Sequence, residues 1–330
     1  MKAIDVHGHC VPRVFLSEIA GTRAFGTAVE QVGGSWIVQL PGAPALRPIA
    51  GVMLDGPERI DWMADQGLAH QIVAPWLDVQ GQELPAPLGR DWAALLNDAL
   101  ATSVGDSDGL LSAHATVHLG DAEAAATELR RAVTQLGMRG VMIPCSPPGV
   151  PLSDPARDPL WAAATDLGTP VVLHATTSSG AAGLLAGHPA LRGLYARNIE
   201  TTLVTAELLV TGVLDRFPDL RLVAVHGGGM LPYQAGRFAQ DHPRRGERPV
   251  PELLRALYYD TVLMTAPALR FLHQVVGPNR IMLGSDFGAT ARERAGVRVA
   301  AAVEESAGSP AELEAVLAGT ARSVFTARPV

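Results

Sequence analysis

Eight short apolar runs, many of them rich in β-branched residues, alternate along this chain with longer segments of helical periodicity. Short apolar runs predict buried strands, whereas apolar residues at i, i+3, i+4 and i+7 predict one face of a helix. Eight strand–helix units within 330 residues predict an α/β fold, a (β/α)8 TIM barrel. The predicted strands are Ala3–His7, Gln71–Pro75, Leu111–Val117, Gly140–Ile143, Pro170–His174, Leu220–His226, Tyr258–Leu263 and Ile281–Ser285.

Two segments depart from the plain repeat. An insertion after the first strand, about residues 20–50, contains Gly33, Gly34 and the strand-like Ser35–Leu40, and this pattern predicts a small β-hairpin. The second segment, Asn198–Phe217, predicts one long helix. Because no internal repeat or linker divides the chain, we expect residues 1–330 to form a single barrel domain.

The charge balance excludes several classes of partner. The chain has 33 acidic and 26 basic residues and a net charge of −7, without long runs of one sign. It therefore offers no basic surface for nucleic acid or for an anionic membrane. The N-terminal sequence reaches Asp5 and His7 too early for a secretory signal, and Cys10 and Cys145 are too few for a disulfide framework. We expect a soluble, cytoplasmic protein.

The lysine content excludes further classes of catalytic and binding site. Lys2 is the only lysine, so every other basic residue is an arginine. The chain interior therefore has no lysine for a Schiff base or for a phosphate-binding P-loop.

Polar residues stand at the ends of several predicted strands. His7 and His9 flank a glycine at the end of the first strand, and residues two apart in a strand point to the same side. His174 ends the fifth run and Asp286 follows the eighth. In a (β/α)8 barrel, these strand ends form the active-site face. Three imidazoles and a carboxylate predict a catalytic divalent ion, with Zn²⁺ favoured over Mn²⁺.

His226 ends the sixth run and would face the same centre. We interpret it as the acid/base group beside a metal-bound water, because the usual imidazole pKa of ~6.5 suits proton transfer near pH 7. A lone HxH pair, or a single histidine after an apolar run, could equally be structural. Their joint placement at four strand ends favours the metal site. His118, which ends the third run, could line the pocket, and Cys145 is interpreted as a small buried hydrophobe.

These motifs resemble a known family. The HxH in IDVHGH, the LH, the HGGG and the GSD resemble the amidohydrolase superfamily, and in particular the branch typified by aminocarboxymuconate-semialdehyde decarboxylase. Residues 200–238 resemble that branch nearly throughout, as do the passages RIDWMADQGLAHQIV and GTARSVF. The resemblance implies a metal ion held by a set of four ligands and a separate acid/base residue, His226. The implied ligands are His7, His9, His174 and Asp286.

The resemblance also implies two arginines that bind the substrate carboxylate. Arg47 lies at the end of the insertion, and Arg237 lies in YQAGRF. In the typifying enzyme the arginine matching Arg237 enters the neighbouring subunit's site, which implies a homodimer; a surface salt bridge or a helix cap is the alternative role. A planar guanidinium grips a carboxylate through two hydrogen bonds.

Two comparisons with the family refine the expected chemistry. Binuclear members bridge two metals with a carbamylated lysine after strand four, where this chain has Cys145, so one metal ion is expected. The residues after His174 and Asp286 depart from the typifying enzyme, which predicts a different pocket wall. We expect decarboxylation of a small unsaturated or aromatic carboxylate, with Asp286 sharing the proton chemistry. Hydrolysis or hydration at the same mononuclear site is the alternative, and a non-catalytic metal-binding protein is the third.

Overall fold

A computed structural model of the chain describes residues 2–22, 24–41, 48–176, 183, 185, 187–188, 191–241, 248–288 and 298–325. Eight parallel strands form one sheet in the order β1-β4-β5-β6-β7-β8-β9-β10. Their bounds are β1 Ala3–Cys10, β4 Leu68–Pro75, β5 Leu111–Ala115, β6 Gly140–Pro144, β7 Val171–His174, β8 Leu222–Ala224, β9 Tyr258–Asp260 and β10 Ile281–Met282. Each predicted strand is present, although the third and the last three end earlier than predicted. The predicted (β/α)8 barrel is confirmed.

The last strand region returns to the first and closes the barrel. The amide of Val6 donates to the carbonyl of Leu283 at 2.9 Å, and the amide of His9 donates to the carbonyl of Phe287 at 2.9 Å. The amide of Asp286 donates to the carbonyl of His7 at 2.7 Å. This closure brings the HxH segment and Asp286 together, although they lie at opposite ends of the sequence.

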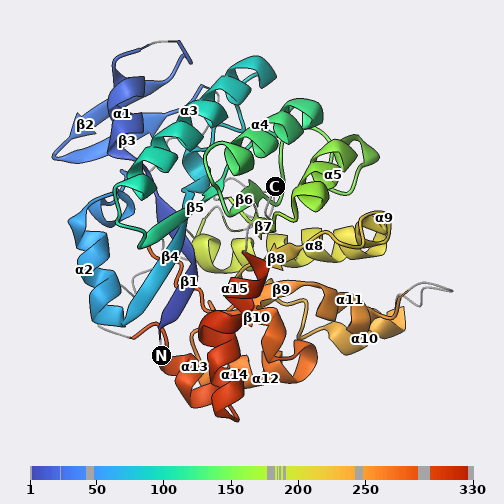
Figure 1. The fold of residues 1–330 in the computed structure, drawn as a ribbon. Helices are drawn as coiled ribbons and strands as arrows, with labels where there is room; N and C mark the ends of the chain where they lie inside the picture. The colour runs from blue at the N-terminus through green and yellow to red at the C-terminus, as the bar shows by residue number, and fades with distance from the viewer. Residues whose placement is uncertain are drawn as a thin grey trace.

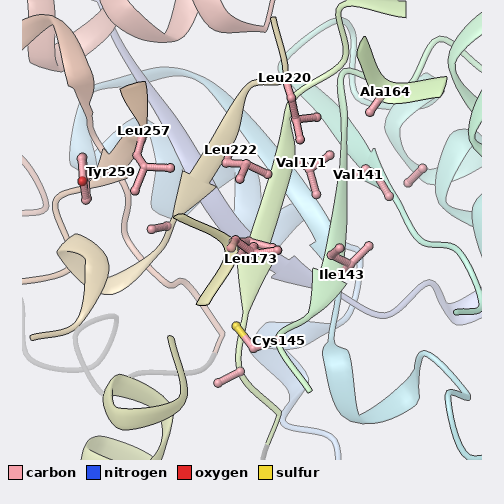
Figure 2. Close-up of a cluster of buried hydrophobic side chains, with 14 of the residues drawn as sticks. Val141, Ile143, Cys145, Ala164, Val171, Leu173, Leu220, Leu222, Leu257 and Tyr259 are labelled. Carbon is pink, nitrogen blue, oxygen red and sulfur yellow. The ribbon is translucent and has the colours of Figure 1, made fainter. Parts of the chain in front are cut away.

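Side chains alternate between the inside and the outside of the barrel. Val141, Ile143, Val171 and Leu173 belong to the large cluster that packs against the surrounding helices (Figure 2). Met142 and Val172, one position along, belong to a smaller cluster contributed mainly by the strands. This period of two is the one that a strand dictates, and it fills the barrel with apolar side chains. The interior below the strand ends is therefore a packed core.

Helices surround the strands (Figure 1). Their bounds are α1 Arg13–Ala20, α2 Pro57–Gln66, α3 Ala86–Gly105, α4 Ala122–Thr134, α5 Asp158–Leu167, α8 Arg197–Val210, α9 Val213–Arg216, α10 Ala235–Asp241, α11 Val250–Ala256, α12 Ala266–Val276, α13 Ala301–Ser306, α14 Pro310–Glu314 and α15 Thr320–Val324. Among the described residues, no helix combines the length and the apolar character that a bilayer crossing requires.

The predicted hairpin is present in the insertion. Strands β2 (Ala28–Val32) and β3 (Ser35–Gln39) pair in antiparallel fashion across Gly33 and Gly34. Both glycines have positive φ, 57° and 82°, which a two-residue turn of this kind requires. Beyond the turn, apolar side chains of the insertion join a cluster with residues of α1 and α3, so the hairpin is anchored to those helices.

The prediction of one long helix over Asn198–Phe217 is wrong. The segment forms α8, which ends at Val210, and the short α9, which begins at Val213. Gly212 lies between them with φ 76° and ψ 27°, in the left-handed region. A right-handed helix cannot continue through that conformation, and glycine adopts it without steric penalty.

A close contact between α3 and the loop after β5 gives a stability prediction. A methyl group at Gly89 would lie 2.1 Å from Cδ2 of the buried His118 side chain. We expect Gly89→Ala to lower the free energy of unfolding by about 1–3 kcal/mol, because such overpacking forces the ring or the helix to move. Gly105→Ala in the same helix meets nothing within 4 Å and serves as the control. Urea unfolding of both variants measures the difference, and equal stabilities would contradict the prediction.

Candidate metal centre

Three histidines form a compact triangle at the C-terminal end of the barrel strands. The ring centroids of His7, His9 and His174 are each 5.1 Å from one another. The ring planes meet at 81° to 87°, so the three imidazoles present their edges rather than stacking. His226 completes the group, with its ring centroid 4.9 Å from that of His174. The predicted convergence of these four histidines is therefore present.

Asp286 brings a carboxylate to the same point. Its Oδ1 lies 3.1 Å from Nε2 of His9 and 3.4 Å from Nε2 of His7. One potential ligand atom from each of His7, His174, His226 and Asp286 lies within 4.8 Å of the others. His9 adjoins this set, because its Nε2 is 3.3 Å from Nε2 of His7. All five side chains are buried, and His226 is the most exposed at 8%.

The hydrogen bonds of two histidines show that this arrangement fits a bound cation. Nδ1 of His7 lies 2.6 Å from Oδ2 of Asp260, and Nδ1 of His174 lies 2.8 Å from the carbonyl of Ala175. Each Nδ1 therefore carries the proton, and each Nε2 lone pair faces the centre. Nε2 of His174 is buried and has no hydrogen-bond partner. Converging lone pairs and a carboxylate repel one another unless a cation lies between them, so the residues form a metal site.

The protonation states of four of the five groups also suit metal binding; the exception is His7, where burial lowers the pKa but the hydrogen bond with Asp260 and the neighbouring carboxylates raise it by more. Burial lowers the pKa of His9 and lowers that of His174 well below its usual value. Burial likewise lowers the pKa of His226, to about 4. Burial alone would raise the pKa of Asp286, but its hydrogen bond with His9 and the neighbouring imidazoles outweigh this effect and the pKa falls. At neutral pH these three imidazoles are neutral and the carboxylate is ionised, which are the forms that bind metals.

The backbone is unusual at two of these residues. His226 and Asp286 both have φ of 56°, a region that few non-glycine residues occupy. Such conformations persist where surrounding structure enforces them, and they concentrate at functional sites. The three glycines after His226 also have positive φ, and other parts of this chain pack closely against each of them. A methyl group at Gly229 would lie 2.5 Å from the carbonyl oxygen of Asn198 in α8.

Sequence reasoning missed Asp260, which connects two parts of the centre. Its Oδ2 accepts the His7 hydrogen bond, and its Oδ1 accepts one from the amide of Gly227 at 2.9 Å. One carboxylate therefore orients an imidazole of the triangle and the turn that carries His226. Asp260 ends β9. The strand-end rule that identified His174 would have found it.

A second buried network supports the first strand. Asp5 accepts hydrogen bonds from Nε2 of Gln71 at 2.7 Å and from Oγ of Ser285 at 2.5 Å. Arg59 in α2 donates to Oε1 of Gln71 at 2.8 Å and to the carbonyl of His9 at 2.6 Å. Gly8 gives this network its room, because a methyl group there would lie 2.8 Å from Cδ of Gln71. These contacts hold β1 in place, and β1 carries both His7 and His9.

The Asp260 contacts give a testable prediction. We expect Asp260→Asn to weaken metal affinity about 10- to 100-fold, because the ligand imidazole loses its charged orienting partner. Competition with a chelating dye measures the affinity. Asp219→Asn, an exposed carboxylate on the loop before β8, is the matched control and should bind the metal as the unmodified protein does. Unchanged affinity in Asp260→Asn would show that Asp260 does not support the centre.

The other residues singled out in the sequence lie elsewhere. Arg47 falls outside the described residues, and Arg237 lies on the exposed surface of α10. Cys145 is buried among apolar side chains, and burial raises the pKa of its thiol, so it is the predicted small hydrophobe. His118 packs against Gly89 of α3 and accepts a hydrogen bond from the amide of Gly120 at 3.2 Å. It is not part of the metal centre.

The sequence profile described as Amidohydrolase matches residues 77–326. The chain belongs to the amidohydrolase family. The match covers more than half of the chain and includes His174, His226 and Asp286, while the HxH segment precedes it.

Curated relatives of this amidohydrolase include decarboxylases. The 2-amino-3-carboxymuconate-6-semialdehyde decarboxylase of Dictyostelium discoideum is 27% identical over 60% of this chain, and the match spans 56% of that protein. The decarboxylase orsB of Emericella nidulans is 29% identical over 82% of this chain and 85% of its own length. The chain thus spans little more than half of the first relative and most of the second.

Solved structures share the fold. The 5-carboxyvanillate decarboxylase LigW of Sphingomonas paucimobilis superposes with a TM-score of 0.82 at 20% identity, covering 99% of this chain and 100% of that one. The dihydroxybenzoic acid decarboxylase of Polaromonas superposes with a TM-score of 0.77 at 20% identity, covering 98% of this chain and 96% of that one, and contains manganese. These similarities establish the same barrel architecture in this amidohydrolase.

Proposed function

We propose that this amidohydrolase is a divalent-metal-dependent, non-oxidative decarboxylase of a small aromatic or unsaturated carboxylic acid. The observation that carries the proposal is the buried triangle of His7, His9 and His174 with Asp286, beside which the more exposed His226 lies. Relatives named as decarboxylases support this reaction over others that the same kind of centre performs.

His7, His9, His174 and Asp286 would hold one divalent ion. Zn²⁺ suits three imidazoles and a carboxylate, and Mn²⁺, present in the Polaromonas structure, is the alternative. When bound, the ion polarises and orients a substrate oxygen. His226 then remains for acid/base work, since its side chain keeps the most exposure and its Nε2 lies 4.0 Å from Oδ2 of Asp286.

The reaction balances without an oxidant or an organic cofactor. The bond between the carboxylate and its neighbouring carbon breaks, and CO2 leaves. The electron pair stays on that carbon, where the conjugated system spreads the charge. A proton then replaces the lost carboxylate, and His226 and Asp286 would hold and transfer it. Hydrogen bonds to Asp260 and Ala175 fix the imidazoles of His7 and His174, so these two rings are not available for proton transfer.

The test is CO2 release by the metal-loaded protein from a panel of hydroxybenzoic, carboxyvanillic and carboxymuconic acids. Turnover in D2O should place one deuterium on the carbon that loses the carboxylate. The chelated protein is the control and should release none. If the loaded protein forms no CO2 from any acid of the panel, decarboxylation is wrong for this chain.

Hydration is the second candidate, because one relative favours it. The 2-keto-4-carboxy-3-hexenedioate hydratase of Sphingobium is 27% identical over 50% of this chain and 48% of its own length. The same centre would then activate water for addition to a conjugated double bond, with His226 or Asp286 taking and returning the proton. Product analysis separates the candidates: decarboxylation removes one carbon, whereas hydration adds water.

We further propose that the protein is a homodimer. Large apolar side chains are exposed on α8, on the turn after β8 and on α12, including Leu203 at 63%, Tyr233 at 75% and Phe271 at 38%. A hollow of about 380 Å³ lies between Tyr233, Phe271 and the Gly227 turn. A face of this kind, close to the catalytic turn, suits burial against a second copy. Arg237 follows Tyr233 by four residues and would lie near the interface.

The dimer proposal predicts a change in mass in solution. We expect Tyr233→Glu to convert a dimer into a monomer, because a buried unpaired carboxylate opposes association. Light scattering coupled to size exclusion measures the mass. Tyr195→Glu, also exposed but on the segment that precedes α8, provides a comparison for how far the interface extends. A monomeric unmodified protein would overturn the proposal.

A further inference from the structure

Arg197, the first residue of α8, is a cation at the metal centre that neither the sequence motifs nor the comparisons identify. Among the described residues, α8 is the first α-helix of more than one turn that follows β7. Strand β7 carries His174. Its first turn packs on the glycine turn that follows His226. The amide of Met230 donates to Oγ1 of Thr202 at 2.8 Å, and the carbonyl of Asn198 borders Gly229. The start of α8 is therefore held beside the catalytic histidine.

The charge of Arg197 acts on the centre itself. It lowers the pKa of His9, His174 and His226, in addition to the larger effect of burial on each. Three imidazoles from β1, β7 and the turn after β8 therefore lie within its electrostatic reach. The next side chain, Asn198, is neutral and donates to the carbonyl of Leu194 at 2.8 Å, and Arg197 is the basic residue of the first turn of α8.

The hydrogen bonds of Arg197 differ from those of two other arginines whose Nε is buried without a partner, Arg59 and Arg157. Their terminal nitrogens are satisfied: those of Arg59 donate to Gln71 and to the carbonyl of His9, and those of Arg157 donate to the carbonyls of Leu119 and Val150. Arg197 is half-buried, and its buried Nε has no hydrogen-bond partner within the described part of the chain. A buried donor without a partner is unfavourable unless a ligand completes it.

We propose that Arg197 is a specificity-determining residue that binds a carboxylate of the substrate beside the metal centre. This inference rests on the proposed function for the substrate class, an aromatic or unsaturated carboxylate. The guanidinium presents Nε–H and its terminal N–H groups in a fork that matches the two oxygens of a carboxylate. A carboxylate there would satisfy the buried Nε. A neutral analogue that lacks the carboxylate would leave that donor without a partner.

The test compares two probes that differ in the carboxylate: 2,6-dihydroxybenzoate and resorcinol. Calorimetric titration of the Mn²⁺-loaded protein should show tighter binding of the acid. In Arg197→Met the affinity for the acid should fall about 10- to 100-fold, the loss of charge-assisted hydrogen bonds, while the affinity for resorcinol should stay unchanged. Arg197→Lys should give an intermediate loss. Arg255→Met, an exposed arginine of α11, removes the same charge and should bind both probes as the unmodified protein does.

Several outcomes overturn the inference. One is an unmodified protein that prefers resorcinol or binds neither probe. Others are an Arg197→Met variant with undiminished affinity for the acid, or one that loses metal and both probes together, which would indicate a structural role. The CO2 assay is separate: acid binding that depends on Arg197 without CO2 release supports this site and contradicts decarboxylation. In an active protein, Arg197→Met should raise KM more than it lowers kcat.

Discussion

Replacing His174 by alanine is expected to empty the metal centre and reduce turnover below detection. His174 is 2% exposed, its Nδ1 is fixed by the carbonyl of Ala175, and its Nε2 has no hydrogen-bond partner in the described structure. We therefore expect that nitrogen to bind the metal ion. Because changes in residues that only support a ligand weaken binding about 10- to 100-fold, loss of a ligand should weaken it by at least that factor.

The measurement is metal content per chain after dialysis, together with CO2 release. His118→Ala is the matched control: it removes another buried histidine, but one that packs between Gly89 and Gly120 outside the centre. It should lose stability and keep the metal. Full metal occupancy in His174→Ala would contradict the assignment of His174 as a ligand.

Replacing His226 by glutamine is expected to lower kcat by about 10² to 10⁴, the usual contribution of a general acid or base. Metal content should stay at one ion per chain, because three imidazoles and Asp286 remain. This prediction distinguishes two roles for His226, acid/base group and metal ligand, because the geometry allows both. His226 lies within 4.8 Å of His7, His174 and Asp286 through ligand atoms, and could itself be a ligand.

Metal analysis decides between these roles. Loss of the ion in His226→Gln would make His226 a ligand and would transfer the acid/base role to another group. An ion retained with undiminished turnover would remove His226 from the chemistry altogether. His273→Gln, a partly exposed histidine of α12, is the control and should change neither metal content nor kcat.

The barrel and its histidines could be predicted because each signal is local. A strand buried on both faces consists of a short apolar run in the sequence. The polar residue that follows the run marks the position where the strand ends and a loop begins. His174 and Asp286 were identified in this way. The fold then required their convergence, because parallel strands end on the same face of a closed barrel.

The helix over Asn198–Phe217 shows where local reasoning fails. Its apolar periodicity continues across Gly212, and a glycine within a helical pattern is often tolerated. The backbone at Gly212 adopts φ 76°, and the helix ends before it. Whether a glycine stays helical depends on the packing of the flanking segments, which the sequence pattern does not encode.

The sequence by itself determined the fold class, the hairpin and the five polar residues of the centre, since period, turn chemistry and strand-end position are properties of neighbouring residues. Only the tertiary structure decided which groups orient the side chains of that centre and which charges lie near it. Asp260 directs the His7 lone pair inward from another strand, and Arg197 brings a cation from the start of α8. Both effects depend on distance through space and on burial. Hydrogen bonding and Coulombic interaction act over a few ångströms whatever the separation along the chain.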